Sequence, residues 1–259
     1  GVVPNLTTNG YGLTDEWVKT LAERCGGVAV SRYENCDVCY DAVKKLTDSG
    51  IEQVTIHQLL SVETYDQCIK AIDDCANDPR LTKLKAILFL TLKPKGKRNK
   101  QNILKDVSKY RKLVEYAMEK KVNIGFDSCS APIFLMAMKD HPNFKNFSMM
   151  SESCESNRFS GYANAKGEYW HCSFTEEQPG WSGIDLTKIE DFQKDVWMAP
   201  EVIRFRNKLI CQNNEHIDKE CYLCPVFDLY NSEIGNASDT VYRPTISIYA
   251  EQKVVNKDS

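Results

Sequence analysis

The chain has 259 residues, of which 42% are hydrophobic and 27% charged, and its formal net charge is −3. This composition is typical of a soluble globular protein with one large domain, or one domain and a small appendage, and it excludes disordered, collagen-like and coiled-coil chains. No apolar run reaches the roughly 18 residues of a membrane span, and the weak negative charge gives no general attraction to nucleic acid. Neither a membrane nor a nucleic acid is therefore an expected partner.

The first half of the sequence alternates between short apolar runs and longer segments whose apolar residues have helical spacing. The predicted strands cover residues 3–8, 27–31, 51–57, 84–92 and 122–126. The predicted helices cover residues 13–24, 37–49, 62–75, 103–120 and 131–139, and Thr14 is the expected N-cap of the first. Strands separated by helix-length segments indicate a parallel α/β sheet, either an open doubly wound sheet or part of a βα barrel. In both cases function is expected at the carboxyl ends of the strands.

The pattern changes near residue 150. Short strands at 160–163 and 168–173 predict a hairpin, and helices are predicted at 186–194 and 199–211. We therefore expect three regions: a βα unit over residues 1–145, a small α+β module over 146–230 and a polar tail over 231–259.

Four of the eleven cysteines form a candidate metal site in the second half of the chain. Cys154 and Cys172 flank the predicted hairpin, and Cys221 and Cys224 follow as a CxxC pair. Four thiolates suit either Zn²⁺ or an iron–sulfur cluster, and the ligand type does not distinguish these two. Structural disulfides or four unrelated buried thiols are the alternatives.

The remaining cysteines have several interpretations. Cys129 follows the last strand of the first half and precedes a helix, so a lowered thiol pKa is expected there. It is a candidate radical relay, substrate contact or rival ligand of the cluster, or a small buried residue. Cys211 is expected in the core, and five more cysteines are expected as buried thiols beside helices. A secreted protein with five disulfides, glycosylated at Asn5, Asn146 and Asn236, is a further alternative.

A basic stretch lies at the end of the fourth predicted strand. Residues 93–100 contain five basic side chains, four lysines and one arginine. Such a stretch can bind an anionic substrate, or it can be a solvated loop.

The segment from Cys154 to Phe174, with its Gly167-x4-Cys172 spacing, resembles the opening of a SPASM or twitch domain. These domains are the C-terminal auxiliary-cluster modules of radical S-adenosylmethionine (radical SAM) enzymes. The resemblance continues through residues 191–206 to Cys221-x2-Cys224 and ends at about Val226. Because no cysteine follows Cys224, the chain resembles the shorter twitch version, with one 4Fe–4S cluster on Cys154, Cys172, Cys221 and Cys224.

The first half resembles part of a radical SAM barrel. Residues 4–10 look like its third strand, and residues 28–31, 54–57 and 88–90 look like the next three. The resemblance implies a partial (β/α)6 barrel, comprising strands three to six and following, with a small C-terminal α+β cluster-binding module. It also implies that Asn9, Ser31 and His57 bind S-adenosylmethionine. Otherwise they are satisfied polar groups at strand ends.

The function that the resemblance implies belongs to a longer protein. The CxxxCxxC motif of the family's catalytic cluster is absent, so the chain resembles an N-terminally truncated fragment that does not cleave S-adenosylmethionine alone. The intact cytoplasmic enzyme would abstract hydrogen from a peptide or small molecule through a 5′-deoxyadenosyl radical, with electrons from a donor such as a flavodoxin or ferredoxin. The alternative is a non-catalytic interaction module that binds zinc through the same four cysteines.

Overall fold

The computed structural model describes residues 1–97, 99–152, 154–210, 224–227 and 229. The larger part of the protein is built on a five-stranded parallel sheet, in which the strands lie in chain order, β1-β2-β3-β4-β5. The strands are β1 (Asn5–Thr8), β2 (Gly27–Arg32), β3 (Val54–Leu60), β4 (Ala86–Thr91) and β5 (Ile124–Phe126). The helices between them are α1 (Asp15–Arg24), α2 (Cys36–Asp48), α3 (Tyr65–Asn77) with the 3-10 turn η1 (Pro79–Leu81), and α4 (Val107–Lys120). The predicted α/β fold with a parallel sheet is confirmed.

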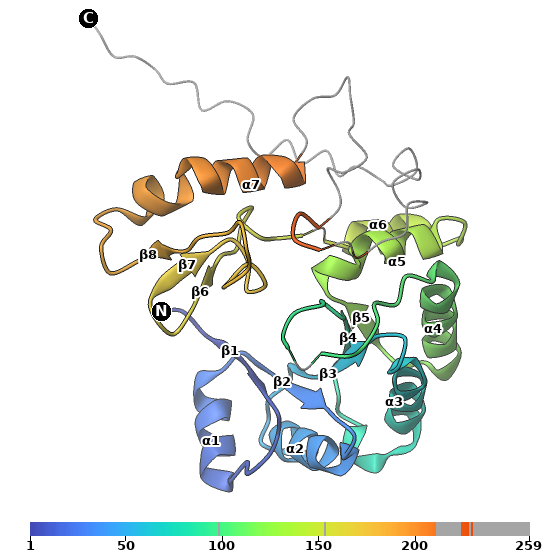
Figure 1. Cartoon of the computed structure of the whole chain (residues 1–259). Helices are drawn as coiled ribbons and strands as arrows, with labels where there is room; N and C mark the ends of the chain where they lie inside the picture. The colour runs from blue at the N-terminus through green and yellow to red at the C-terminus, as the bar shows by residue number, and fades with distance from the viewer. Residues whose placement is uncertain (98, 153, 211–223, 228, 230–259) are drawn as a thin grey trace, which may run out of the picture.

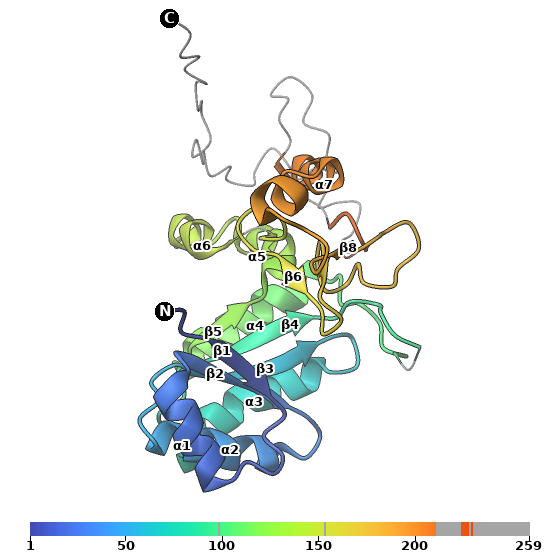
Figure 2. The ribbon, with the colours of Figure 1, turned by 90° about the vertical axis from the view of Figure 1, so that its left-hand side faces the viewer.

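The helices cover one face of this sheet. Because every crossover joins neighbouring strands in the same direction, right-handed connections put all the intervening helices on the same side. Figures 1 and 2 show α1 to α4 packed around the sheet, with the C-terminal elements at the other end of the molecule from α1 and α2. A doubly wound sheet would instead reverse its strand order part-way.

The core lies between the sheet and these helices. In β3 the buried residues are Val54, Ile56, Gln58 and Leu60, while the residues between them are only half-buried. The same alternation occurs in β4. Since successive side chains of a strand point to opposite faces, one face of the sheet is closed by helices and the other is more open. As predicted, Thr14 is the N-cap of α1, where its side chain accepts a hydrogen bond from the Trp17 N–H.

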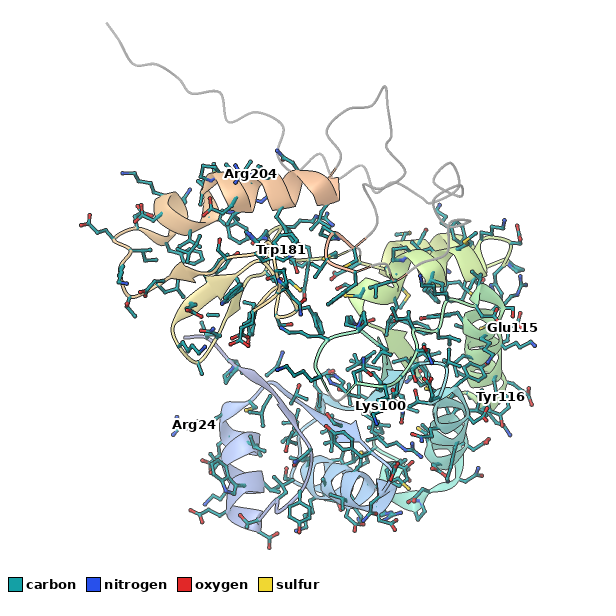
Figure 3. All side chains as sticks on the ribbon, viewed as in Figure 1. Arg24, Lys100, Glu115, Tyr116, Trp181 and Arg204 are labelled. Atoms are coloured by element: carbon teal, nitrogen blue, oxygen red, sulfur yellow. The ribbon has the colours of Figure 1, made fainter. Side chains whose placement is uncertain are left out.

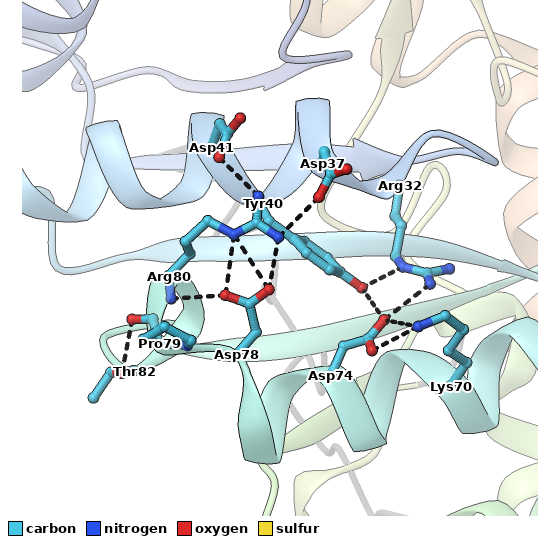
Figure 4. Close-up of polar contacts among 10 residues, drawn as sticks. All are labelled: Arg32, Asp37, Tyr40, Asp41, Lys70, Asp74, Asp78, Pro79, Arg80 and Thr82. Atoms are coloured by element: carbon cyan, nitrogen blue, oxygen red, sulfur yellow. Dashed lines mark hydrogen bonds and ion pairs between the residues drawn. The ribbon is translucent and has the colours of Figure 1, made fainter.

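A buried polar network joins the carboxyl end of β2 to two helices (Figure 4). The Arg32 guanidinium donates to Tyr40 Oη at 2.7 Å and to Gln58 Oε1 at 2.9 Å, and it pairs with Asp74 at 3.3 Å. Tyr40 in turn donates to Asp74 at 2.6 Å, and Lys70 pairs with the same carboxylate. The charge of Arg32 is therefore fully partnered on the helix side of the sheet.

The C-terminal part is a small three-stranded antiparallel sheet covered by a helix. It contains β6 (Tyr162–Ala163), β7 (Glu168–Trp170) and β8 (Ile184–Asp185), then a π-helix at Gln193–Trp197 and α7 (Pro200–Ile210). Tyr169 and Val202 belong to its core. Figure 3 places Trp181 beneath α7, which carries Arg204.

Several sequence predictions differ from the structure. The helix predicted at 186–194 is wrong over its first residues, where Asp185 accepts hydrogen bonds from the backbone and hydroxyl of Thr187 and forms a turn. Only its end is helical, at the start of the π-helix Gln193–Trp197. The hairpin is confirmed, and α5 (Ala131–Met138) matches the helix predicted at 131–139. The helix α6 (Phe144–Met150) and the strand β8 have no predicted counterpart. β3 runs to Leu60, so His57 lies within the strand and not at its end.

Candidate functional site

A cavity of about 270 Å³ lies where loops after β4 and β5 meet the small module. Cys154, Cys172 and Cys224, three of the four predicted metal ligands, line it together. The fourth, Cys221, lies outside the described residues, as does Cys211. Cys129 lines the same cavity from the loop after β5. Segments far apart in the sequence thus bring four thiols to the wall of one cavity.

Cys172 and Cys224 lie in turns with a similar arrangement of N–H groups. The Phe174 N–H donates to Cys172 Sγ at 3.3 Å, while the Thr175 N–H donates to the Cys172 carbonyl oxygen at 2.9 Å. At Cys224 the N–H groups near the sulfur are again those of the second and third residues after the cysteine. Burial raises the pKa of both thiols, while these N–H groups act against that shift. The N–H groups in each turn thus offset part of the effect of burial, although the pKa of each thiol stays raised.

Cys129 differs from the expectation for its thiol. It lies in the 3-10 turn η2 (Ser128–Ser130), directly before α5. Burial raises its pKa to about 12, although the positive charge of Lys93 acts in the opposite direction. The expected lowering of this pKa is wrong, because desolvation outweighs the nearby helix N-terminus and the lysine.

The nine described cysteines are all thiols, none of them in a disulfide. Since the chain has eleven cysteines, the alternative with five disulfides is wrong. Cys39 and Cys68 are buried beside helices as predicted, and burial raises the pKa of each to about 12. Across residues 1–97, 99–152, 154–210, 224–227 and 229, no three His, Cys, Asp or Glu side chains converge closely enough to hold a single metal ion.

The module wall of the cavity is organised around Asn157, which sequence reasoning did not identify. This residue is fully buried with a left-handed backbone, φ 57°. Its amide hydrogen-bonds to His171 Nδ1 at 3.2 Å and accepts from the Tyr169 hydroxyl. The His171 ring stacks on Phe205 with centroids 5.0 Å apart, and burial lowers its pKa. A neutral, fixed imidazole therefore lies next to Cys172.

Two lysines of the predicted basic stretch hold the module against the sheet. Lys93 forms a buried ion pair with Asp127 and lies over the Phe174 ring, 5.5 Å from its centroid. Lys95 Nζ donates to the carbonyl oxygens of Ser173 and Glu176, at 3.0 and 2.8 Å. Lys93 and Lys95 are therefore not available to bind an anion, because protein groups already occupy both, whereas Lys97 and Lys100 of the same stretch are exposed.

The structure places the predicted S-adenosylmethionine ligands near one another on the sheet. Ser31 and His57 are register partners on β2 and β3, and both side chains lie on the more open face. Asn9 directly follows β1, and its carboxamide oxygen accepts from the Tyr11 N–H at 2.9 Å. Burial lowers the pKa of His57, while the charge of Asp127 acts in the opposite direction.

The chain was compared with known proteins. No model of a protein family matches it, and no curated protein matches its sequence. No helix in the described part of the chain is long and apolar enough to cross a membrane. The case for a function therefore rests on the cysteine-lined cavity and its surroundings.

Proposed function

We propose that this chain is the C-terminal part of a radical SAM enzyme whose small module binds an auxiliary 4Fe–4S cluster. The observation that carries this proposal is the cavity shared by Cys154, Cys172 and Cys224. Cys221 belongs to the same CxxC pair as Cys224 and is the fourth thiolate of the predicted set. When bound, such a cluster supplies an electron-transfer centre, and four cysteine ligands leave it no open iron for a substrate.

A cluster fits the cavity better than a single zinc ion does. A single zinc ion binds all its sulfurs at about 2.3 Å, whereas in the described part of the chain no three His, Cys, Asp or Glu side chains converge closely enough to hold one ion. In a 4Fe–4S cluster each thiolate binds a different iron, so the cysteines stand further apart. The N–H donors to Cys172 and Cys224 are of the kind that tune cluster sulfurs.

In this proposal the five-stranded sheet is part of a (β/α)6 barrel that binds S-adenosylmethionine. Asn9, Ser31 and His57 would hold that cofactor. The half-buried imidazole of His57, whose pKa is lowered, is neutral near pH 7 and does not repel a sulfonium cation. The intact cytoplasmic enzyme would remove a hydrogen atom from a peptide or small-molecule substrate, with electrons from a flavodoxin or ferredoxin. Since the chain lacks the CxxxCxxC motif, it should produce no 5′-deoxyadenosine alone.

Cysteine variants test the proposal. We expect anaerobic reconstitution with iron and sulfide to give a brown protein, and Cys172→Ala and Cys224→Ala to lose its visible absorption. Cys75→Ala is the matched control, because Cys75 is half-buried in α3 and does not line the cavity. Unchanged iron in both cavity variants would contradict the proposal. A colourless protein with about one zinc would favour the zinc-binding interaction module instead.

A further inference from the structure

We infer that Cys129, which lies in the turn η2 after β5 and not in the small module, is a ligand of the same inorganic centre. The ligand set would then be Cys129, Cys154, Cys172 and Cys224. This inference rests on the proposed function and extends its site beyond residues 146–230. With Cys129 as the fourth thiolate, Cys221, which lies outside the described residues, would not be required as a ligand, and this set would replace the one given under the proposed function.

The position of the thiol is the first argument. Cys129 lines the cavity together with the other three cysteines. It is close enough to Cys154 and Cys224 for charges on the three sulfurs to interact. Burial disfavours a free thiolate in this cavity, so a negative charge on any of these sulfurs needs a cation beside it. A positively charged metal centre supplies that compensation, and each thiol exchanges its proton, released to solvent, for a metal–sulfur bond.

The turn that carries Cys129 is fixed before any metal binds. The Asp127 carboxylate accepts hydrogen bonds from the Ser130 hydroxyl and, at 3.3 Å, from the Thr91 N–H. Ser130 and Thr91 are almost fully buried, and their hydroxyls also hydrogen-bond to each other. Thr91 is tied to Tyr110 Oη at 3.1 Å. This network attaches η2 to β4 and α4, so the cysteine is held at the cavity wall by rigid elements.

The contacts between the two parts of the chain support a shared ligand set. The bonds from Lys95 go to Ser173 and Glu176, which follow closely after Cys172 in the sequence. Cys224 and Phe227 pack against the core of the sheet, as Cys129 does. The module cysteines are therefore already held beside the loop after β5. A centre bound from both sides would cross-link the small module to the sheet.

The experiment compares single cysteine variants of the full chain after anaerobic reconstitution with iron and sulfide. We expect Cys129→Ser and Cys129→Ala to lose at least half of the bound iron or to change the EPR spectrum of the reduced protein. Cys75→Ser, another half-buried thiol that packs against the same core, should match the wild type, and so should Cys221→Ser. Circular dichroism of each metal-free protein reports whether the variant is folded.

Alkylation of the wild type gives an answer that does not depend on a variant folding. Mass spectrometry after iodoacetamide treatment should show Cys129 protected by metal loading, with Cys75 equally reactive before and after. Full iron and an unchanged EPR spectrum in both Cys129 variants, or equal alkylation of Cys129, would overturn the inference. If the wild type binds zinc without sulfide, the proposed function fails, and the zinc content of Cys129→Ser then decides the inference alone. A wild type that binds neither metal overturns both.

Discussion

Lys93 and Asp127 form an ion pair between the segments that follow β4 and β5, at the edge of the cysteine-lined cavity. Their side chains are only 7% and 17% exposed. The same carboxylate anchors the turn that carries Cys129, through Ser130 and the Thr91 N–H. The same lysine lies over Phe174 of the module. One buried pair thus joins the sheet, the cysteine turn and the small module.

Removing both partners of this pair should destabilise the protein by less than the sum of the two single removals. Lys93→Met leaves the Asp127 carboxylate buried without its cation, which costs about 3 kcal/mol. Asp127→Asn likewise leaves the Lys93 charge buried without its partner. In urea unfolding, we expect the Lys93→Met, Asp127→Asn double variant to lose at least about 1 kcal/mol less than the sum of the single losses. Additive losses would mean that the two charges do not stabilise each other.

The Arg32 network predicts a pH-dependent contribution to stability (Figure 4). Burial alone would raise the pKa of Asp74, but hydrogen bonds from Lys70 and Tyr40 and the charge of Arg32 outweigh it, and the pKa is lowered. The stabilisation is therefore present above the unfolded carboxyl pKa of about 3.9 and is lost as pH falls through the folded value.

Asp74→Asn should accordingly lower the unfolding free energy at pH 7 by about 2 kcal/mol. The difference from the wild type should shrink below about pH 4. Glu23→Gln, at an exposed position in α1, is the control and should change stability by less than about 0.5 kcal/mol. A constant difference between wild type and Asp74→Asn across this pH range would show that the carboxylate charge is irrelevant.

His57 predicts the opposite pH dependence. Burial lowers its pKa, and the charge of Asp127 offsets only part of the shift. The unfolded chain therefore binds this proton more readily than the folded one, so stability falls as pH drops below the unfolded value of about 6.5 and levels off below the folded pKa. In urea melts between about pH 7.5 and 5, His57→Gln should reduce this slope. An identical slope in the variant is the contradicting result.

Gly161 is predicted to be essential for packing of the small module. A Cβ atom there would lie 2.4 Å from Cε2 of the Tyr169 ring, inside its contact distance. Gly161→Ala should therefore destabilise the module by about 2 kcal/mol through overpacking. The same substitution in a Tyr169→Leu background should cost much less, because the ring is gone. Calorimetric unfolding of the wild type, the two single variants and the double variant checks this. An equal loss of stability from Gly161→Ala in both backgrounds would contradict the prediction.

Local patterns in the sequence predict most elements of the larger part. Thr14 caps α1, and apolar residues at helical spacing mark α2, because both signals depend on neighbours within one turn. The end of β3 is misplaced by three residues, since only the register with β2 and β4 decides where the strand stops. Residues 186–190 do not form a helix despite their helical pattern, because side-chain hydrogen bonds to Asp185 compete with the helix there.

The candidate site is only partly visible in the sequence. The spacing of Cys154, Cys172 and Cys224 predicts a shared site, because a hairpin and a CxxC turn are local signals. The place of Cys129 at the same cavity depends on how β5 meets the module, which no local pattern encodes. Asn157 is equally invisible, since its partners are chosen by tertiary packing around a left-handed backbone.

The measurement that tests the central claim most directly is the iron, sulfide and zinc content of the purified chain after anaerobic reconstitution, with EPR of the reduced protein. The proposed cluster predicts about four iron and four sulfide per chain, and an EPR signal that Cys172→Ala abolishes. About one zinc per chain without sulfide, or iron that remains in Cys172→Ala, would contradict the claim.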